Sequence, residues 1–138
     1  MPDKFEFSTI IPVRITDINY GNHLGNDSLL SLIHEARVQY LNNINLTEMD
    51  VGGCGIIMVD SAIIYKSEIF YGDNLIFNIS VDGFTSTSCD FYYQVISKNS
   101  SKEAALAKTG IVFFDYTRKK ISQVSNIFNE KVEKLKSR

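Results

Sequence analysis

The chain has few of the residues that mark disulfide-rich or metal-binding proteins. It contains two cysteines, two histidines, two prolines and no tryptophan among 138 residues. Cys54 and Cys89 follow no metal-binding or redox spacing. We therefore expect reduced, packed cysteines in a cytoplasmic protein, with a structural disulfide as the alternative. No metal constellation appears in the sequence, so no metal site is expected.

Long apolar runs and basic stripes are also missing. No apolar run approaches the roughly 18 residues that a membrane-spanning helix needs. Charges interrupt the first ten residues, where a signal peptide would need an apolar core. The net charge is −2, and no basic stripe lies outside the last few residues. The sequence thus predicts a cytoplasmic protein that binds neither membranes nor nucleic acid.

The residues that are present suit one globular core. Hydrophobic residues make up 44% of the chain and aromatic residues 12%. A chain of this length buries one sizeable core but hardly two, so we expect residues 1–138 to form a single domain. There is no internal repeat, linker or low-complexity segment.

The first third of the chain predicts a strand followed by a long helix. Residues 5–18 are rich in β-branched and aromatic side chains, which favours a strand that Pro12 limits to an edge or a break. A polar loop follows. From Asn26 or Asp27, either of which can cap, apolar residues recur up to Leu41 at helical spacing. Because the apolar stripe is broad, we expect this helix to be largely buried.

The rest of the chain predicts strands and a short final helix. Residues 73–84 alternate apolar and polar side chains as a half-buried strand demands. Similar strand-like runs cover residues 56–67, 86–97 and 103–116. A short amphipathic helix capped by Ser125 or Asn126 follows. This order predicts an α+β fold, in which one long helix covers an antiparallel sheet of about five strands.

The segment from Val13 to Leu41 carries a characteristic series of residues: Asp17, Asn19, Asn22, His23, Leu24, Gly25 and Asn26, then Glu35, Ala36, Arg37, Val38, Tyr40 and Leu41. With these residues the chain resembles, over nearly its whole length, the hotdog-fold thioesterases, in the branch similar to 4-hydroxybenzoyl-CoA thioesterase. In that branch an Asp-x-Asp pair ends a strand, a Gly-His-Val-Asn-Asn-like turn follows, and the helix carries a Glu-Ala-Arg-Val-x-Tyr-Leu-like segment. The later segments YKSEIFYGDNL and GIVFFDYTRKKI also resemble this family.

The resemblance implies a hotdog fold, a curved antiparallel sheet wrapped around one long central helix. It implies an acyl-CoA thioesterase that hydrolyses a small or medium acyl thioester at the N-terminus of that helix. The substrate would be an acyl-CoA or acyl-carrier thioester, with coenzyme A as part of the substrate and no other cofactor. Exposed strand edges predict a homodimer or homotetramer.

The start of the predicted helix can bind a reacting carbonyl oxygen. The first backbone N–H groups of a helix have no intrahelical acceptor, and the helix dipole favours negative charge there. We expect the N–H groups of Gly25, Asn26 and Asp27 to hold the thioester oxygen. The alternative is that Asn26 serves only as the N-cap.

The general base is harder to assign, because Asn19 stands where the family has its second acidic residue. An amide cannot take a proton from water as a carboxylate does, although it can position water or bind the thioester oxygen. Asp17 would share a face with Asn19 in an extended strand. His23 lies in the polar loop, and imidazoles titrate near neutral pH. The alternative for Asp17 is a turn residue that is hydrogen-bonded to the loop backbone. The alternative for His23 is an imidazole that only packs within the loop.

Two further carboxylates are candidates. Glu35 lies on the helix, about two turns in, where the alternative is a solvated residue paired with a nearby cation. Asp60 interrupts the apolar run IIMVDSAII, where a carboxylate is costly unless it is paired or functional. At a subunit interface beside the site, Asp60 could replace the acid missing at Asn19. The alternative is a hydrogen-bonded interface aspartate.

Two other functions remain open at this point. A hotdog protein could bind an acyl thioester without turning it over, which the amide at Asn19 would permit. A hotdog enzyme of another class, such as a dehydratase, would use a histidine with a carboxylate. Turnover of acyl thioesters separates these possibilities from the hydrolase.

Overall fold

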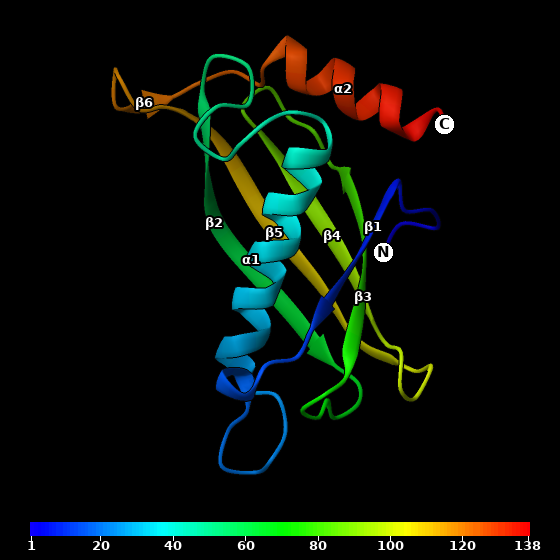
Figure 1. Ribbon diagram of the computed structural model, residues 1–138. Helices are drawn as coiled ribbons and strands as arrows, with labels where there is room; N and C mark the ends of the chain where they lie inside the picture. Colours follow the sequence, from blue (N-terminus) through cyan, green and yellow to red (C-terminus); the bar gives the residue numbers. More distant parts are fainter.

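The computed structural model describes residues 1–138 as a six-stranded antiparallel sheet with two helices (Figure 1). The strands are β1 (Phe7–Pro12), β2 (Gly55–Tyr65), β3 (Asn74–Asp82), β4 (Ser88–Ser97), β5 (Glu103–Asp115) and β6 (Lys120–Ile121). The helices are α1 (Asn26–Asn43) and α2 (Asn126–Lys136), and a 3-10 turn, η1, covers Ile15–Asp17. The sheet order is β1-β3-β4-β5-β2, with β6 beside β5. The predicted α+β fold with an antiparallel sheet is confirmed.

The first strand is shorter than predicted. β1 is an edge strand that ends at Pro12, as the proline indicated. The chain then turns, because the Asp17 carboxylate accepts a hydrogen bond from the backbone N–H of Arg14 at 2.8 Å and closes η1. Residues 15–17 are therefore not extended, contrary to the prediction of a strand up to residue 18. The two-residue β6 was not predicted, because it is too short to leave a pattern.

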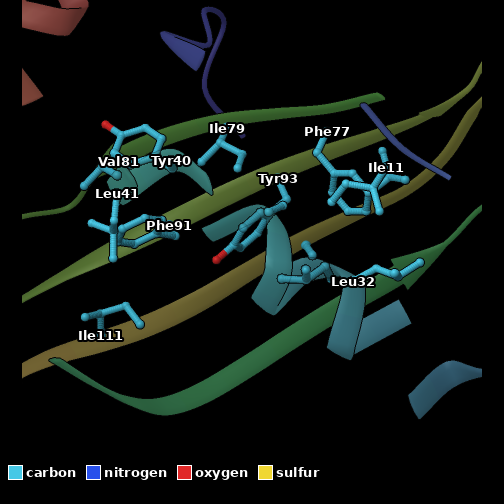
Figure 2. Close-up of a cluster of buried hydrophobic side chains, with 14 of the residues drawn as sticks. Ile11, Leu32, Tyr40, Leu41, Phe77, Ile79, Val81, Phe91, Tyr93 and Ile111 are labelled. Atoms are coloured by element: carbon cyan, nitrogen blue, oxygen red, sulfur yellow. The ribbon is translucent and has the colours of Figure 1, made fainter. Parts of the chain in front are cut away.

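The core lies between α1 and one face of the sheet (Figures 1 and 2). Leu75, Phe77, Ile79 and Val81 alternate along β3 and are fully buried, which confirms the expected half-buried strand. Figure 2 shows Tyr93 on β4 among these side chains, close to α1. One face of α1 stays exposed, including Ser31, Glu35 and Asn42, so the helix is less buried than its apolar stripe predicted.

A β-bulge in β2 changes the face of the sheet to which the following side chains point. Met58 pairs with Ile111 of β5, whereas Asp60 pairs with the adjacent Gly110, so Val59 is an extra residue. A bulge inserts one residue and shifts the alternation of faces beyond it. Without the bulge, alternation from the buried Ile56 would point Asp60 toward the core.

Arg37 ties α1 to both β4 and the segment after the helix. Its guanidinium is buried and donates to Glu48 Oε2 at 2.8 Å and to the Tyr93 hydroxyl at 3.3 Å. His34 Nε2 lies 2.6 Å from Glu48 Oε1, and Tyr93 bonds Thr109 of β5 at 2.8 Å. This network holds α1 in one position over the sheet.

The C-terminal helix closes the end of the molecule that carries β6 (Figure 1). Ser125 caps α2 by accepting from the N–H of Phe128 at 3.1 Å, one of the two predicted caps. Lys131 Nζ donates to the carbonyl of Ile44 at 2.7 Å, just after α1. Neither Cys54 nor Cys89 forms a disulfide, as expected. Neither helix is long and apolar enough to span a membrane.

Candidate active site

The start of α1 presents backbone donors without a side-chain cap. Gly25 is the N-cap residue, so Asn26 is the first helical residue rather than the cap. The Gly25 N–H donates to the Asp17 carbonyl at 3.1 Å and is not available to a ligand, contrary to the prediction. The N–H groups of Asn26, Asp27 and Ser28 have no acceptor in the protein. Three such donors at the positive end of the helix dipole can bind an anionic oxygen.

A tight loop before the helix brings Asn19 and His23 together. The N–H of Asn19 donates to the His23 carbonyl at 3.0 Å, and Asn19 Oδ1 accepts from the N–H of Gly21 at 2.9 Å. Gly21 lets the two side chains approach, because a Cβ there would lie 2.8 Å from His23 Nε2 and 3.4 Å from Asn19 Oδ1 and would displace the imidazole. The Asn19 side chain also approaches Gly25, whose Cβ would lie 3.7 Å from that of Asn19.

The neighbouring carbonyl determines which nitrogen of His23 is free. His23 Nδ1 lies 3.3 Å from the Leu24 carbonyl oxygen, a contact that requires Nδ1 to carry the proton. In the neutral ring Nε2 then keeps its lone pair. The ring is half-buried and lines a pocket, and Nε2, which lies beside Gly21, can accept a hydrogen bond.

The pocket lies between the start of α1 and the end of β2 and has a volume of about 290 Å³. Its lining combines four apolar and five polar residues: Leu24, Leu29, Tyr65 and Ile69, with His23, Asn26, Lys66, Ser67 and Glu68. The Tyr65 hydroxyl lies 3.4 Å from the Asn26 carbonyl oxygen. Partial burial raises the pKa of Tyr65, and the negative charge of Asp27 raises it further. The phenol therefore stays protonated as a donor at the pocket rim.

The Asp17 carboxylate is turned away from this pocket. It is buried, and both of its oxygens accept from the Arg14 side chain, at 3.1 and 3.3 Å. The hydrogen bond to Asp17 raises the pKa of the Arg14 guanidinium, as does the charge of Asp17. Asp17 supports the helix start through its backbone carbonyl, while its carboxylate closes η1.

Glu35 and Asp60 also lie away from the helix start. Glu35 borders a separate groove between α1 and β1 and accepts from Gln39 at 3.0 Å. Asp60 pairs in register with Gly110, which pairs with Asp90. The neighbours of Asp90 on β4 are buried in the core, so the side chains of Asp90 and Asp60 point to the other face of the sheet, away from α1. There Asp60 accepts from Lys108 Nζ at 3.1 Å and from the Gly110 N–H at 3.0 Å.

The second wall of the pocket, which includes Tyr65 and Glu68, was not predicted from the sequence. Tyr65 and Glu68 come from the end of β2 and the segment after it, about forty residues after the helix start. The signal was present in the family-like segment YKSEIFYGDNL. Their place beside His23 depends on a tertiary contact, in which the Leu24 N–H donates to the Ile69 carbonyl at 2.7 Å.

The structure contains neither a metal-binding cluster nor an ionised buried cysteine elsewhere. No group of three or more His, Cys, Asp and Glu side chains lies close enough to hold a metal ion. Burial strongly raises the pKa of the Cys89 thiol, which keeps it protonated. The helix start and its pocket are therefore the candidate active site.

Known proteins share this fold. The sequence profile of the thioesterase-like superfamily matches residues 13–132, so the chain belongs to that superfamily. No curated protein matches the chain. Its structure is similar to a 1,4-dihydroxy-2-naphthoyl-CoA thioesterase from Synechocystis, at 19% identity and a TM-score of 0.84 over 94% of this chain and 97% of that one.

Two further structures extend this likeness. YbaW, a probable thioesterase from Escherichia coli, is 21% identical with a TM-score of 0.78, over 93% of this chain and 97% of that one. A Staphylococcus aureus protein in complex with CoA is 10% identical with a TM-score of 0.84, over 95% of this chain and 84% of that one. The predicted resemblance to hotdog-fold thioesterases is confirmed.

Proposed function

We propose that this protein hydrolyses the thioester of a small or medium acyl group carried by coenzyme A or an acyl carrier. The observation that carries the proposal is the start of α1, where the N–H groups of Asn26, Asp27 and Ser28 have no protein acceptor at the edge of a pocket. Membership of the thioesterase-like superfamily supports it. So does the similarity to a protein described as a CoA thioesterase and to one in complex with CoA.

The reaction uses the helix start as its electrostatic element. The thioester carbonyl oxygen lies against the free N–H groups, which bind it more strongly as attack by water places negative charge on it. The thiolate then leaves readily, since the thiol has a pKa near ~8.5. Asn19 and His23 hold the attacking water, and Tyr65 donates at the rim. A pocket of about 290 Å³ suits a small or medium acyl group.

A second candidate function is binding of an acyl thioester without hydrolysis. Two observations favour it: an amide occupies position 19, and the Asp17 carboxylate is bound by Arg14. A protein that lacked a general base would still bind the carbonyl oxygen at the helix start. Only the first function includes turnover of the thioester.

We expect the active form to be a homodimer, or a homotetramer of two such dimers, in which β2 strands of two copies pair. β2 has eleven residues and pairs only with β5, so its other edge is open. Met58, Val59, Ile64 and Tyr65 expose apolar surface along it. Long open edges are normally covered, and a twofold axis would pair β2 with itself antiparallel. The sheet and α1 of each copy would then form one hotdog unit.

The substrate class is tested with a panel of short, long and aromatic acyl-CoA thioesters, with a thiol reagent detecting the released coenzyme A. We expect turnover of at least one short or medium member. Binding without turnover of any member would favour the second candidate function. Neither binding nor turnover would refute both.

The oxyanion site is tested by Asn26→Pro. Proline is well tolerated at the first helical position, and Gly25 has the extended ψ of 152° that a residue before proline needs. The substitution removes one backbone donor while keeping the helix. We expect kcat to fall about 10²–10³-fold. Asn26→Ala, which keeps the N–H, is the matched control, and equal activities of the two variants would refute this role.

A further inference from the structure

The proposed hydrolysis needs a proton acceptor for the attacking water, and within one copy of the chain the carboxylates expected from the sequence do not supply one. Asp17 is held by Arg14, Glu35 borders another groove, and Asp60 lies on the far face of the sheet. A general base must reach the reacting water directly or through one further water. None of the three lines the pocket at the helix start.

Glu68 is the one carboxylate that lines this pocket, together with His23 and Asn26. Its side chain takes part in none of the ion pairs of the structure, unlike those of Asp17, Glu48 and Glu103. No side-chain hydrogen bond engages it either. A carboxylate without a protein partner, beside an oxyanion site, is free to bind water.

The backbone on both sides of Glu68 is anchored. The N–H groups of Lys66 and Ser67 both donate to the carbonyl of Ala104 on β5, at 2.9 and 3.3 Å. On the other side, the Ile69 carbonyl accepts from Leu24 at 2.7 Å, and Ile69 is buried. These hydrogen bonds hold the backbone at Glu68 next to the loop that leads into α1. Catalytic groups need such rigid support to keep productive geometry.

Asp27 is the competing carboxylate, since its charge acts on Tyr65 at the rim of the pocket. Asp27 lies in the first turn of α1. Its Oδ1 lies beside the cap residue, 2.9 Å from where a Cβ of Gly25 would stand, and Asp27 does not line the pocket. Glu68 lies outside the helix and does line the pocket.

We infer that Glu68 is the general base of this site, in place of the family acid that Asn19 has replaced. The inference rests on the proposed thioesterase function. Glu68 takes a proton from water as the water oxygen bonds to the thioester carbonyl carbon, and the oxyanion forms against the N–H groups of α1. The C–S bond then breaks, the thiolate leaves with the electron pair, and Glu68 returns the proton to sulfur. The products are a carboxylic acid, which ionises to solvent, and a free thiol.

The test compares wild type with Glu68→Gln, Asp27→Asn and Glu130→Gln on the best thioester of the panel. Glu130 is an exposed glutamate on α2 at the opposite end of the molecule, so its variant is the matched control. We expect Glu68→Gln to lower kcat about 10²–10⁴-fold, the usual share of a general base, with little change in KM. Glu130→Gln should keep wild-type kcat.

Chemical rescue separates catalysis from structure. Formate or acetate should restore part of the turnover of Glu68→Ala, whose truncated side chain leaves room for a small carboxylate, but not that of Glu68→Gln. Absence of rescue, or a Glu68→Gln variant with at least half the wild-type kcat, would overturn the assignment. A kcat loss confined to Asp27→Asn would overturn it in favour of Asp27. A wild-type protein without any turnover would instead refute the proposed function itself.

Discussion

Replacing Arg37 by methionine probes the buried network that positions α1. The guanidinium is only 5% exposed, and its loss leaves Glu48 with His34 as its one remaining partner. Tyr93 keeps its hydrogen bond to Thr109. Removing one partner of a buried ion pair costs about 3–5 kcal/mol. Because the Glu48 side chain is 27% exposed, water can partly resolvate it, and we expect a loss of about 3 kcal/mol.

The measurement is equilibrium unfolding in urea followed by far-UV circular dichroism, since the chain has no tryptophan to report by fluorescence. In thermal unfolding, a loss of this size should lower Tm by about 10 °C for a domain of this length. Arg118→Met is the control, because that side chain is 72% exposed and its carboxylate partner is 3.9 Å away. An exposed pair of this kind is worth less than about 1 kcal/mol.

The double variant Arg37→Met/Glu48→Met decides whether the cost comes from the unpaired charge. Replacing both members of a buried pair with apolar residues is often nearly neutral. We therefore expect the double variant to be more stable than Arg37→Met alone, within about 1 kcal/mol of wild type. A double variant as unstable as the sum of the two single ones would refute the reasoning, as would a single variant of wild-type stability.

Three other predictions concern pH, the bulge and the open edge. Burial works to raise the pKa of Glu48, but hydrogen bonds from Arg37 and His34 outweigh it and lower the pKa below the ordinary 4.5. The wild-type protein should therefore be more stable than Glu48→Gln, with the full difference above pH 4.5. In urea unfolding this difference should shrink as the pH falls further. Gly110→Ala would place a Cβ 2.6 Å from Asp60 Oδ2 and displace this exposed carboxylate from the Gly110 N–H. We expect a loss of about 1 kcal/mol or less in thermal unfolding, and a loss well above this would mean that Asp60 cannot move aside. Ser61→Lys puts a charge on the open edge of β2 and should shift a dimer toward monomer in analytical ultracentrifugation, while an unchanged dimer would place the interface elsewhere.

Much of the fold could be predicted from the sequence because its signals are local. The alternating apolar residues of β3, the broad stripe of α1 and the cap at Ser125 each leave a pattern within about ten residues, and each was found where expected. The segment at residues 103–108 has high helix propensity yet forms part of β5, because the β-branched and aromatic residues that follow extend the strand. The η1 turn was missed because it depends on the hydrogen bonds between Arg14 and Asp17, which leave no hydrophobic pattern in the sequence.

The candidate site was predictable only in its first half. The helix start with Asn26, His23 and Asn19 is contiguous in sequence, and the family motif identified it. Its other wall comes from the segment after β2, which reaches the site through a long-range backbone contact between Leu24 and Ile69.

Asp60 shows that the register of a strand decides whether a side chain can belong to the site. Its position in an apolar run indicated a carboxylate that is either paired or functional at a subunit interface. In a regular strand its side chain would point toward the core. The single extra residue at Val59 turns Asp60 to the other face, where Lys108 and the Gly110 N–H satisfy it. An acid that replaces Asn19 must therefore be sought among the residues that line the pocket at the helix start rather than from strand patterns, and Glu68 meets that condition.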